Sequence, residues 1–150
     1  MKINRLFIVA CSILTASAFA DECVIEVGVA DNMNFVPAAL EISKTSCPSV
    51  TVNLTHSGGL QKSVMGHNWV LSTTADSQAV ANAGWGAGLD NQYLPPGDAR
   101  VIASTDVIGG GESTSVTFDT AGLTAGGDYT FFCSFVGHYA IMKGAFVVTE

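Results

Sequence analysis

Three side chains that bind soft metal ions follow one another on a short segment near the C-terminus, YTFFCSFVGHYAIMKG (residues 129–144). Four residues separate Cys133 from His138, and three separate His138 from Met142. Thiolate, imidazole and thioether ligands together suit copper better than magnesium or calcium, which prefer oxygen ligands. Taken singly, each of these residues is ordinary in a β protein, and Met142 most of all. Their combination on one loop predicts a metal site.

A second imidazole is available from His67, which lies far upstream in the segment SVMGHNWVL (residues 63–71). We expect this segment to be a strand that a β sandwich places beside the segment carrying Cys133. His56 is the remaining histidine of the chain. We interpret it as a partly buried structural residue, with a pH-linked role as the alternative. Two imidazoles, a thiolate and a weak thioether form the ligand set of blue-copper sites.

The first twenty residues have the parts of a secretory signal peptide. A positively charged start is followed by the mostly apolar residues 6–16, and AFA at residues 18–20 matches a cleavage site. The apolar run is too short to span a membrane. We therefore predict that residues 1–20 are cleaved and that residues 21–150 form one exported domain with a sizeable core.

The exported domain is strongly acidic. Residues 1–20 contain two of the six basic residues and none of the thirteen acidic ones, so four basic and thirteen acidic side chains leave a net charge of −9. Nucleic acids and anionic membranes attract positively charged proteins. We therefore expect neither of them as a partner.

Three cysteines remain in this domain, because Cys11 is removed with the signal peptide. In an oxidising compartment two of them should pair and one stays unpaired. Cys23 and Cys47 lie together in the N-terminal third and are predicted to form a disulfide. The unpaired Cys133 belongs to the soft-ligand loop, where a bound metal protects its thiol.

Hydrophobic alternation and frequent turn residues predict an all-β domain. Residues 73–87 differ, because capping residues, alanine-rich sequence and then glycines are typical of a short helix. We predict an eight-stranded Greek-key β sandwich with antiparallel pairing and this one helical insertion. Pro37 indicates an edge or a bend in the second strand. The expected strands cover residues 23–29, 35–42, 50–54, 63–71, 100–108, 113–118, 129–135 and 143–148.

Several features spread along the exported domain carry a resemblance to a known family. They are the cysteine pair, VMGHNWVLS at residues 64–72, SVTFD at residues 115–119, and FFCSFVGHYAIMKG at residues 131–144. Together they resemble the azurins, type 1 blue copper proteins with a plastocyanin-like (cupredoxin) domain. The resemblance implies a periplasmic location and one copper ion that alternates between Cu(I) and Cu(II).

The resemblance also implies a role for each residue of the site. Asn68 forms hydrogen bonds across the site and Phe135 lies beside the ligands, so both support the ligand loops. The implied ligands in one plane are His67, Cys133 and His138. Met142 is the implied long axial ligand, and the backbone carbonyl of Gly66 is a weak ligand opposite it.

The implied function is that of a carrier of single electrons, not an enzyme. The implied partners are redox proteins such as c-type cytochromes, nitrite reductase or amine dehydrogenases, and we expect a monomer. An apolar patch around His138 should contact these partners, because such patches mark interaction sites. We predict that this docking patch consists of Met33, Leu60, Val64, Trp85, Val136, Ala140 and Ile141.

Two residues depart from the pattern of the azurins. Val136 stands where the azurins usually have proline. Valine, unlike proline, has a backbone N–H, and we expect this N–H beside the thiolate. Trp85 replaces a residue that is usually smaller or more flexible. Because neither change removes a ligand, we expect them to affect the reduction potential and the choice of partner.

Two other functions remain open from the residues alone. Cys133 could act as a nucleophile with His138 or His67 as its base. The same side chains could instead store a metal such as zinc, which cysteine and histidine also bind. An intense visible colour that bleaches on reduction is expected of the copper electron carrier alone.

Overall fold

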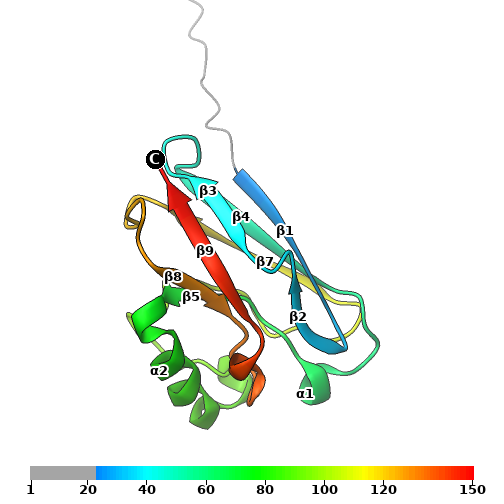
Figure 1. Cartoon of the computed structure of the whole chain (residues 1–150). Helices are drawn as coiled ribbons and strands as arrows, with labels where there is room; N and C mark the ends of the chain where they lie inside the picture. Colours follow the sequence, from blue (N-terminus) through cyan, green and yellow to red (C-terminus); the bar gives the residue numbers. More distant parts are fainter. Residues whose placement is uncertain (1–22) are drawn as a thin grey trace, which may run out of the picture.

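A computed structural model describes residues 23–150 of the chain, and the predicted signal peptide lies outside the described residues. Within this range nine strands form the two sheets of a β sandwich (Figure 1). One sheet has the order β2-β1-β4-β7 and the other β3-β9-β8-β5-β6. In sheet order, their bounds are Asn32–Val36, Cys23–Ala30, Ser49–His56 and Ser113–Asp119, then Leu40–Ser43, Lys143–Thr149, Tyr129–Phe132, Val70–Thr73 and Ala103–Ser104.

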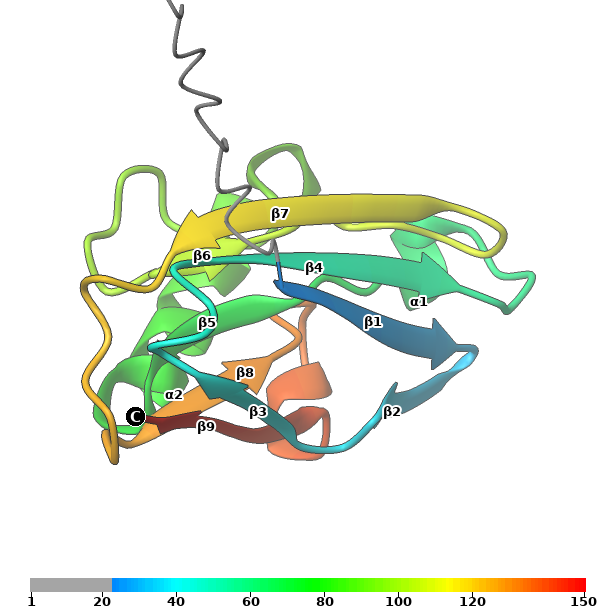
Figure 2. The same cartoon turned by 90° about the horizontal axis from the view of Figure 1, so that it is seen from above.

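The prediction of an all-β sandwich is confirmed, but the expectation of antiparallel pairing is wrong for two strand pairs. β1 pairs with β4 in parallel, and β3 pairs with β9 in parallel. Parallel neighbours need a connection that crosses between layers. Figure 2 shows this crossing, where the chain leaves β2 in one sheet and enters β3 in the other.

Several predicted strands are shorter in the structure. The expected strand 35–42 is divided into β2 and β3 around Pro37, which cannot donate a ladder hydrogen bond. The first half of the expected strand 63–71 is wrong, because the helix α1 (Lys62–Met65) precedes β5. Of residues 100–108, only β6 and an isolated bridge at Ile108 are β structure.

The core lies between the two sheets. In β4 every second side chain is buried, so Val50, Val52 and Leu54 are all fully buried against the other sheet. The indole of Trp69, also fully buried, has the rings of Phe118, Phe131 and Phe146 around it, with ring centroids 6.0 to 6.1 Å away.

The predicted helical insertion is confirmed as α2 (Thr74–Gly84), which continues into a 3₁₀ turn, η1 (Trp85–Ala87), and is followed by a second, η2 (Leu89–Asn91). Thr73 caps α2, because its hydroxyl oxygen accepts from the backbone N–H of Asp76. Val80 and Ala81 pack with Phe132 in a second apolar cluster on the outer face of β5 and β8. No helix in residues 23–150 is long and apolar enough to cross a membrane.

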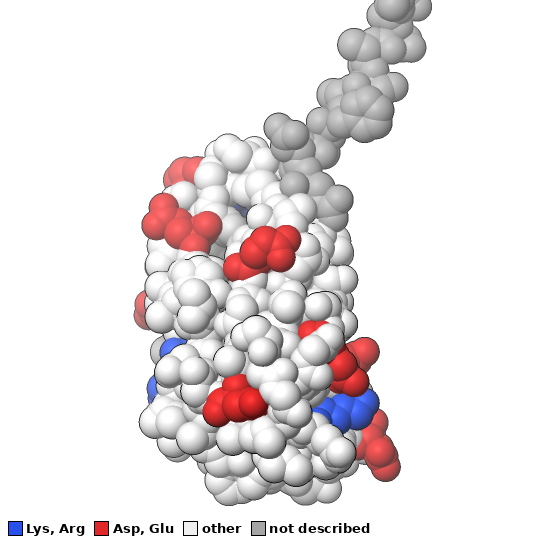
Figure 3. All heavy atoms as spheres, turned by 90° about the vertical axis from the view of Figure 1, so that its right-hand side faces the viewer, with Lys and Arg blue, Asp and Glu red and all other residues white. Residues whose placement is uncertain are grey.

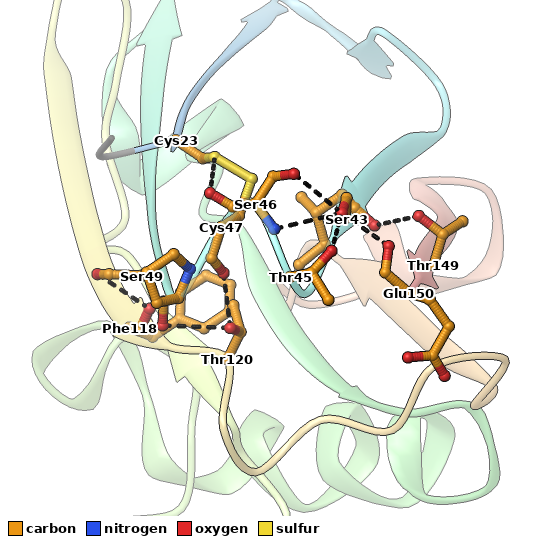
Figure 4. The surroundings of a disulfide bond; sticks show 12 residues. Cys23, Ser43, Thr45, Ser46, Cys47, Ser49, Phe118, Thr120, Thr149 and Glu150 are labelled. Atoms are coloured by element: carbon orange, nitrogen blue, oxygen red, sulfur yellow. Dashed lines mark hydrogen bonds between the residues drawn. A yellow bond between two sulfur atoms is a disulfide. The ribbon is translucent and has the colours of Figure 1, made fainter. Parts of the chain in front are cut away.

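The predicted disulfide between Cys23 and Cys47 is present (Figure 4). Backbone and side-chain hydrogen bonds hold Cys47: its N–H donates to the carbonyl of Ser43, and its carbonyl accepts from the hydroxyl of Thr120. The bridge joins the start of β1 to the loop before β4. It therefore ties the N-terminal strand to the end of the sandwich where β9 finishes (Figure 1).

Candidate metal centre

Three strand ends meet at the opposite end of the sandwich. Phe132 at the end of β8 pairs with Val70 at the start of β5 and with Lys143 at the start of β9. The residues just beyond these strand ends must therefore lie together. Cys133 follows β8 directly, Met142 precedes β9 directly, and the N–H of Cys133 donates to the carbonyl of Met142 over 3.1 Å.

The structure brings the predicted thiol and both predicted imidazoles into one cluster. The Sγ atom of Cys133 lies 3.7 Å from Nδ1 of His67 and 3.5 Å from Nδ1 of His138. Within residues 23–150 these residues are the one group of at least three His, Cys, Asp or Glu side chains that could hold a metal ion. Cys133 and His67 are fully buried, whereas His138 is 6% exposed.

His67 is held in one orientation and one tautomer. Its Nε2–H donates to the carbonyl of Ala30 over 2.9 Å, so the lone pair of Nδ1 faces Cys133. Its backbone is paired with Ile108 by hydrogen bonds in both directions. Burial lowers the pKa of His67 to about 4, although the bond to Ala30 partly offsets this, and burial also lowers the pKa of His138. Both imidazoles are therefore neutral at pH 7, the state that binds a metal.

The thiol of Cys133 fits a metal-binding role better than a nucleophilic one. Burial raises the pKa of this thiol to about 12, although the backbone N–H groups of Asn68 and Phe135 partly offset the effect. The thiol therefore keeps its proton at neutral pH unless a metal ion displaces it. One soft sulfur between two neutral imidazoles is a donor set that fits copper.

Met142 and Gly66, expected as weaker ligands, adjoin this cluster through their backbones. The loop turns at Gly137, whose φ of 84° is left-handed, and the N–H of Met142 then donates to the carbonyl of His138 over 2.8 Å. The carbonyl oxygen of Gly66 lies 4.0 Å from Sγ of Cys133. A Cβ atom at Gly66 would lie 2.3 Å from the carbonyl oxygen of Lys62, so only glycine fits there.

The comparisons with known proteins point to one family. Residues 21–149 match the family model of copper binding proteins of the plastocyanin/azurin family. The chain is 57% identical to the azurin of Bordetella pertussis over 136 residues, which are 91% of this chain and 90% of that one. It is 53% identical to the azurin of Pseudomonas aeruginosa over 133 residues, 89% of each chain. The solved azurin Az-iso2 of Methylomonas sp. strain J superposes with a TM-score of 0.82 at 44% identity, covering 85% of this chain and 98% of that one.

The chain belongs to the plastocyanin/azurin family. It is a type 1 copper protein that transfers electrons, and its cofactor is one copper ion. The group formed by His67, Cys133 and His138 is able to hold that ion.

In this plastocyanin/azurin-family domain, hydrogen bonds of Asn68 connect the segments that carry His67 and Cys133. Its Oδ1 accepts from the backbone N–H of Ser134 over 2.9 Å, and its Nδ2 donates to the hydroxyl oxygen of Ser134 over 2.8 Å. Its Nδ2 donates to the backbone carbonyl of Gln92 over 3.1 Å. The ring of Phe135 lies 4.6 Å from the ring of His138. Gln92 had no signal in the sequence, because it contributes a backbone carbonyl that any residue type possesses.

His56 is more deeply buried than the partly buried residue we predicted, at 1% exposed. Its ring stacks on the ring of His67, with centroids 5.1 Å apart. Its Nδ1 accepts from the N–H of Gly58, and its Nε2–H donates to the carbonyl of Met65. These contacts fit the structural role, since they fix the loop before α1 against the back of His67.

Most residues of the predicted docking patch are exposed. Val136 and Ile141 lie on either side of His138 in the ligand loop and are 45% and 61% exposed. Met33 is the exception, because it is half-buried and packs against the main core. The remaining members are all exposed: Leu60, Val64, Trp85 and Ala140.

Proposed function

We propose that the exported domain, residues 21–150, is a periplasmic carrier of single electrons. In this proposal His67, Cys133 and His138 bind the copper, Met142 is a long axial ligand, and the carbonyl of Gly66 lies opposite it. The observation that supports it most is the convergence of one buried thiol and two Nδ1 atoms, each held by hydrogen bonds of the surrounding chain.

Burial of the ligands favours a carrier over an enzyme. Copper supplies the one-electron couple, and the protein has to hold its ligands still and keep other molecules away. Cys133 and His67 have no exposed surface, so a substrate has no route to them. His138 is the ligand nearest the solvent, and we assign it as the place where the electron enters and leaves.

The docking patch surrounds this exit. Figure 3 shows one side of the molecule, on which acidic side chains are spread over the surface, the lower third included, and only the bottom rim shows neither acidic nor basic groups. A small apolar contact suits a transient electron-transfer complex. We propose redox proteins as partners, with c-type cytochromes, nitrite reductase and amine dehydrogenases as the classes to test first, and a monomeric carrier that binds neither nucleic acid nor membranes.

Of the two alternative functions, nucleophilic catalysis fits the site less well. A nucleophilic Cys133 needs an accessible thiolate, whereas this thiol is fully buried and its pKa is raised to about 12. Storage of zinc uses the same donors, so it has to be separated by experiment. Zinc has no accessible redox change, which provides the distinction.

The test is an absorption spectrum of residues 21–150 after addition of Cu(II), then ascorbate, then air. We expect an intense blue band that bleaches on reduction and returns on reoxidation. The variant Cys133→Ser should lack the band while staying folded, because serine replaces sulfur with little change in volume. A colourless wild-type protein that binds zinc tightly would contradict the proposal.

A further inference from the structure

The segment after η2 has an unusual backbone. Gln92 and Tyr93 have φ angles of 56° and 51°, and within residues 23–150 they are the two residues other than glycine with a positive φ. Side chains with a Cβ atom are disfavoured in this left-handed region. Two such residues in succession persist only where their surroundings hold them.

The contacts of Gln92 show what holds this segment. Its backbone carbonyl accepts from Nδ2 of Asn68 over 3.1 Å and from the hydroxyl of Ser134 over 2.9 Å. Its side-chain oxygen Oε1 accepts from the backbone N–H of Val107 over 2.6 Å. The next residue, Tyr93, packs its ring edge-on against Phe135 with centroids 5.0 Å apart.

The three hydrogen-bond partners of Gln92 each lie next to a proposed ligand or to a residue that pairs with one. Asn68 follows His67 and Ser134 follows Cys133 in the chain. Val107 precedes Ile108, whose backbone is paired with His67. One residue therefore connects three segments that are far apart in the sequence, and all three lead directly to the metal site.

We propose that Gln92 is a positioning residue that fixes the separation of His67 from Cys133. The left-handed backbone of Gln92 directs its carbonyl oxygen towards Asn68 and Ser134. The side-chain amide oxygen of Gln92 accepts from the backbone N–H of Val107 and so holds that segment in place. Resting on the proposed electron-carrier function, this connection keeps the ligand positions unchanged between Cu(II) and Cu(I). Electron exchange is then fast, because little of the protein has to rearrange.

Three substitutions of Gln92 distinguish the contribution of its backbone conformation from that of its side-chain hydrogen bond. Gln92→Gly favours the left-handed backbone but loses the bond to Val107. Gln92→Ala loses that bond but keeps a Cβ atom, so the left-handed backbone stays as disfavoured as in the wild type. Gln92→Asn tolerates the left-handed region with a shorter amide. Asn91→Ala is the matched control, since Asn91 is exposed and, among residues 23–150, its side chain bonds only to Ala87 of the same segment.

We would measure electron self-exchange by NMR and the Cu(II) hyperfine coupling by EPR. Self-exchange in Gln92→Ala should fall by about 2- to 30-fold, the range typical of changes in coupled contacts, with an altered hyperfine coupling. Gln92→Gly and Gln92→Asn should lie between this variant and the wild type, and Asn91→Ala should match the wild type. Wild-type values in Gln92→Ala, or equal changes in Asn91→Ala, would overturn the proposal.

A second measurement uses the copper-free protein, so it does not depend on the proposed function. The rate at which a thiol reagent modifies Cys133 reports how firmly its surroundings are held. We expect a faster reaction in Gln92→Ala than in Asn91→Ala. If the wild type binds no copper but this difference is seen, the function is wrong and the positioning role stands; equal rates overturn the positioning role. Gln92→Gly serves the same comparison if Gln92→Ala does not fold.

Discussion

At the scale of single residues, burial sets the charge of the side chains at the metal centre. It lowers the pKa of His67 and His138 and raises the pKa of Cys133. All three are therefore uncharged in the copper-free protein at neutral pH. Copper has to displace one proton, from sulfur, and none from nitrogen.

This charge state predicts how acid affects the copper-free protein. A histidine whose pKa falls from 6.5 to about 4 on folding binds a proton more readily when unfolded, so stability falls as the pH drops through this window. We expect the loss between pH 6.5 and 4.5 to approach about 1.4 kcal/mol per pH unit from His67. Urea unfolding at several pH values measures it. In the variant His67→Gln the free energy of unfolding should depend less steeply on pH. An equal dependence in variant and wild type would contradict the lowered pKa of His67.

The same charge state predicts proton release on metal binding. At pH 7.5 each Cu(II) ion bound should release about one proton, because only the thiol is protonated beforehand. A pH-indicator dye in weakly buffered solution measures this number. The variant Cys133→Ser should release almost none. Release of two protons by the wild type would mean that one imidazole is protonated at this pH.

The sequence predicted residues with distinctive side-chain chemistry. Apart from Gly66, which the resemblance implied, it did not predict the residues that act through a backbone carbonyl. Cys133, His138 and Met142 could be found because their side chains are spaced on one short loop. The carbonyls of Ala30 and Gln92 could not, since their roles depend on where the fold directs a backbone oxygen. Gln92 was especially hard to find, because nothing in its residue type favours a left-handed backbone.

At the scale of elements, local signals succeeded where one segment determines its own structure. The capping residues at Thr73 and Asp76 predicted α2, whose first turn they close themselves. The strand prediction for residues 63–71 is wrong in its first half, because α1 interrupts a strand-like sequence and His67 is placed by a single bridge to Ile108. That bridge depends on contacts far away in the sequence, which a periodicity argument does not include.

The link between α2 and the ligand loop gives a prediction at this scale. The hydroxyl of Tyr139, next to His138, shares a 2.8 Å hydrogen bond with the buried hydroxyl of Ser77 in α2. Tyr139→Phe should destabilise the copper-free protein by about 1 kcal/mol. Tyr129→Phe is the control of equal size, because its hydroxyl accepts from the N–H of Thr124 at an exposed turn far from the metal centre. Urea unfolding compares them, and a larger loss at Tyr129 would refute this link.

At the scale of the whole molecule, the net charge of −9 for residues 21–150 should govern long-range encounters. At low ionic strength a small cationic cobalt complex should oxidise the reduced protein faster than an anionic iron complex of similar driving force. Added salt should bring the two rates together, because the Debye length shortens to about 8 Å at 0.15 M. Stopped-flow recovery of the blue band measures both rates. Rates that do not depend on salt would mean that the charges lie too far from the electron's exit.

The docking patch gives a second prediction at this scale, which a mutation at each end of the sandwich can test. Ile141→Asp places a charge beside His138, whereas Val24→Asp adds the same charge on β1 at the disulfide end, where Val24 is 53% exposed. Two copies must bring their exits together to exchange an electron, so Ile141→Asp should slow self-exchange about tenfold or more through lost apolar contact and like-charge repulsion. Val24→Asp should leave it nearly unchanged. Equal slowing by both substitutions would show that net charge, and not the patch around His138, controls the encounter.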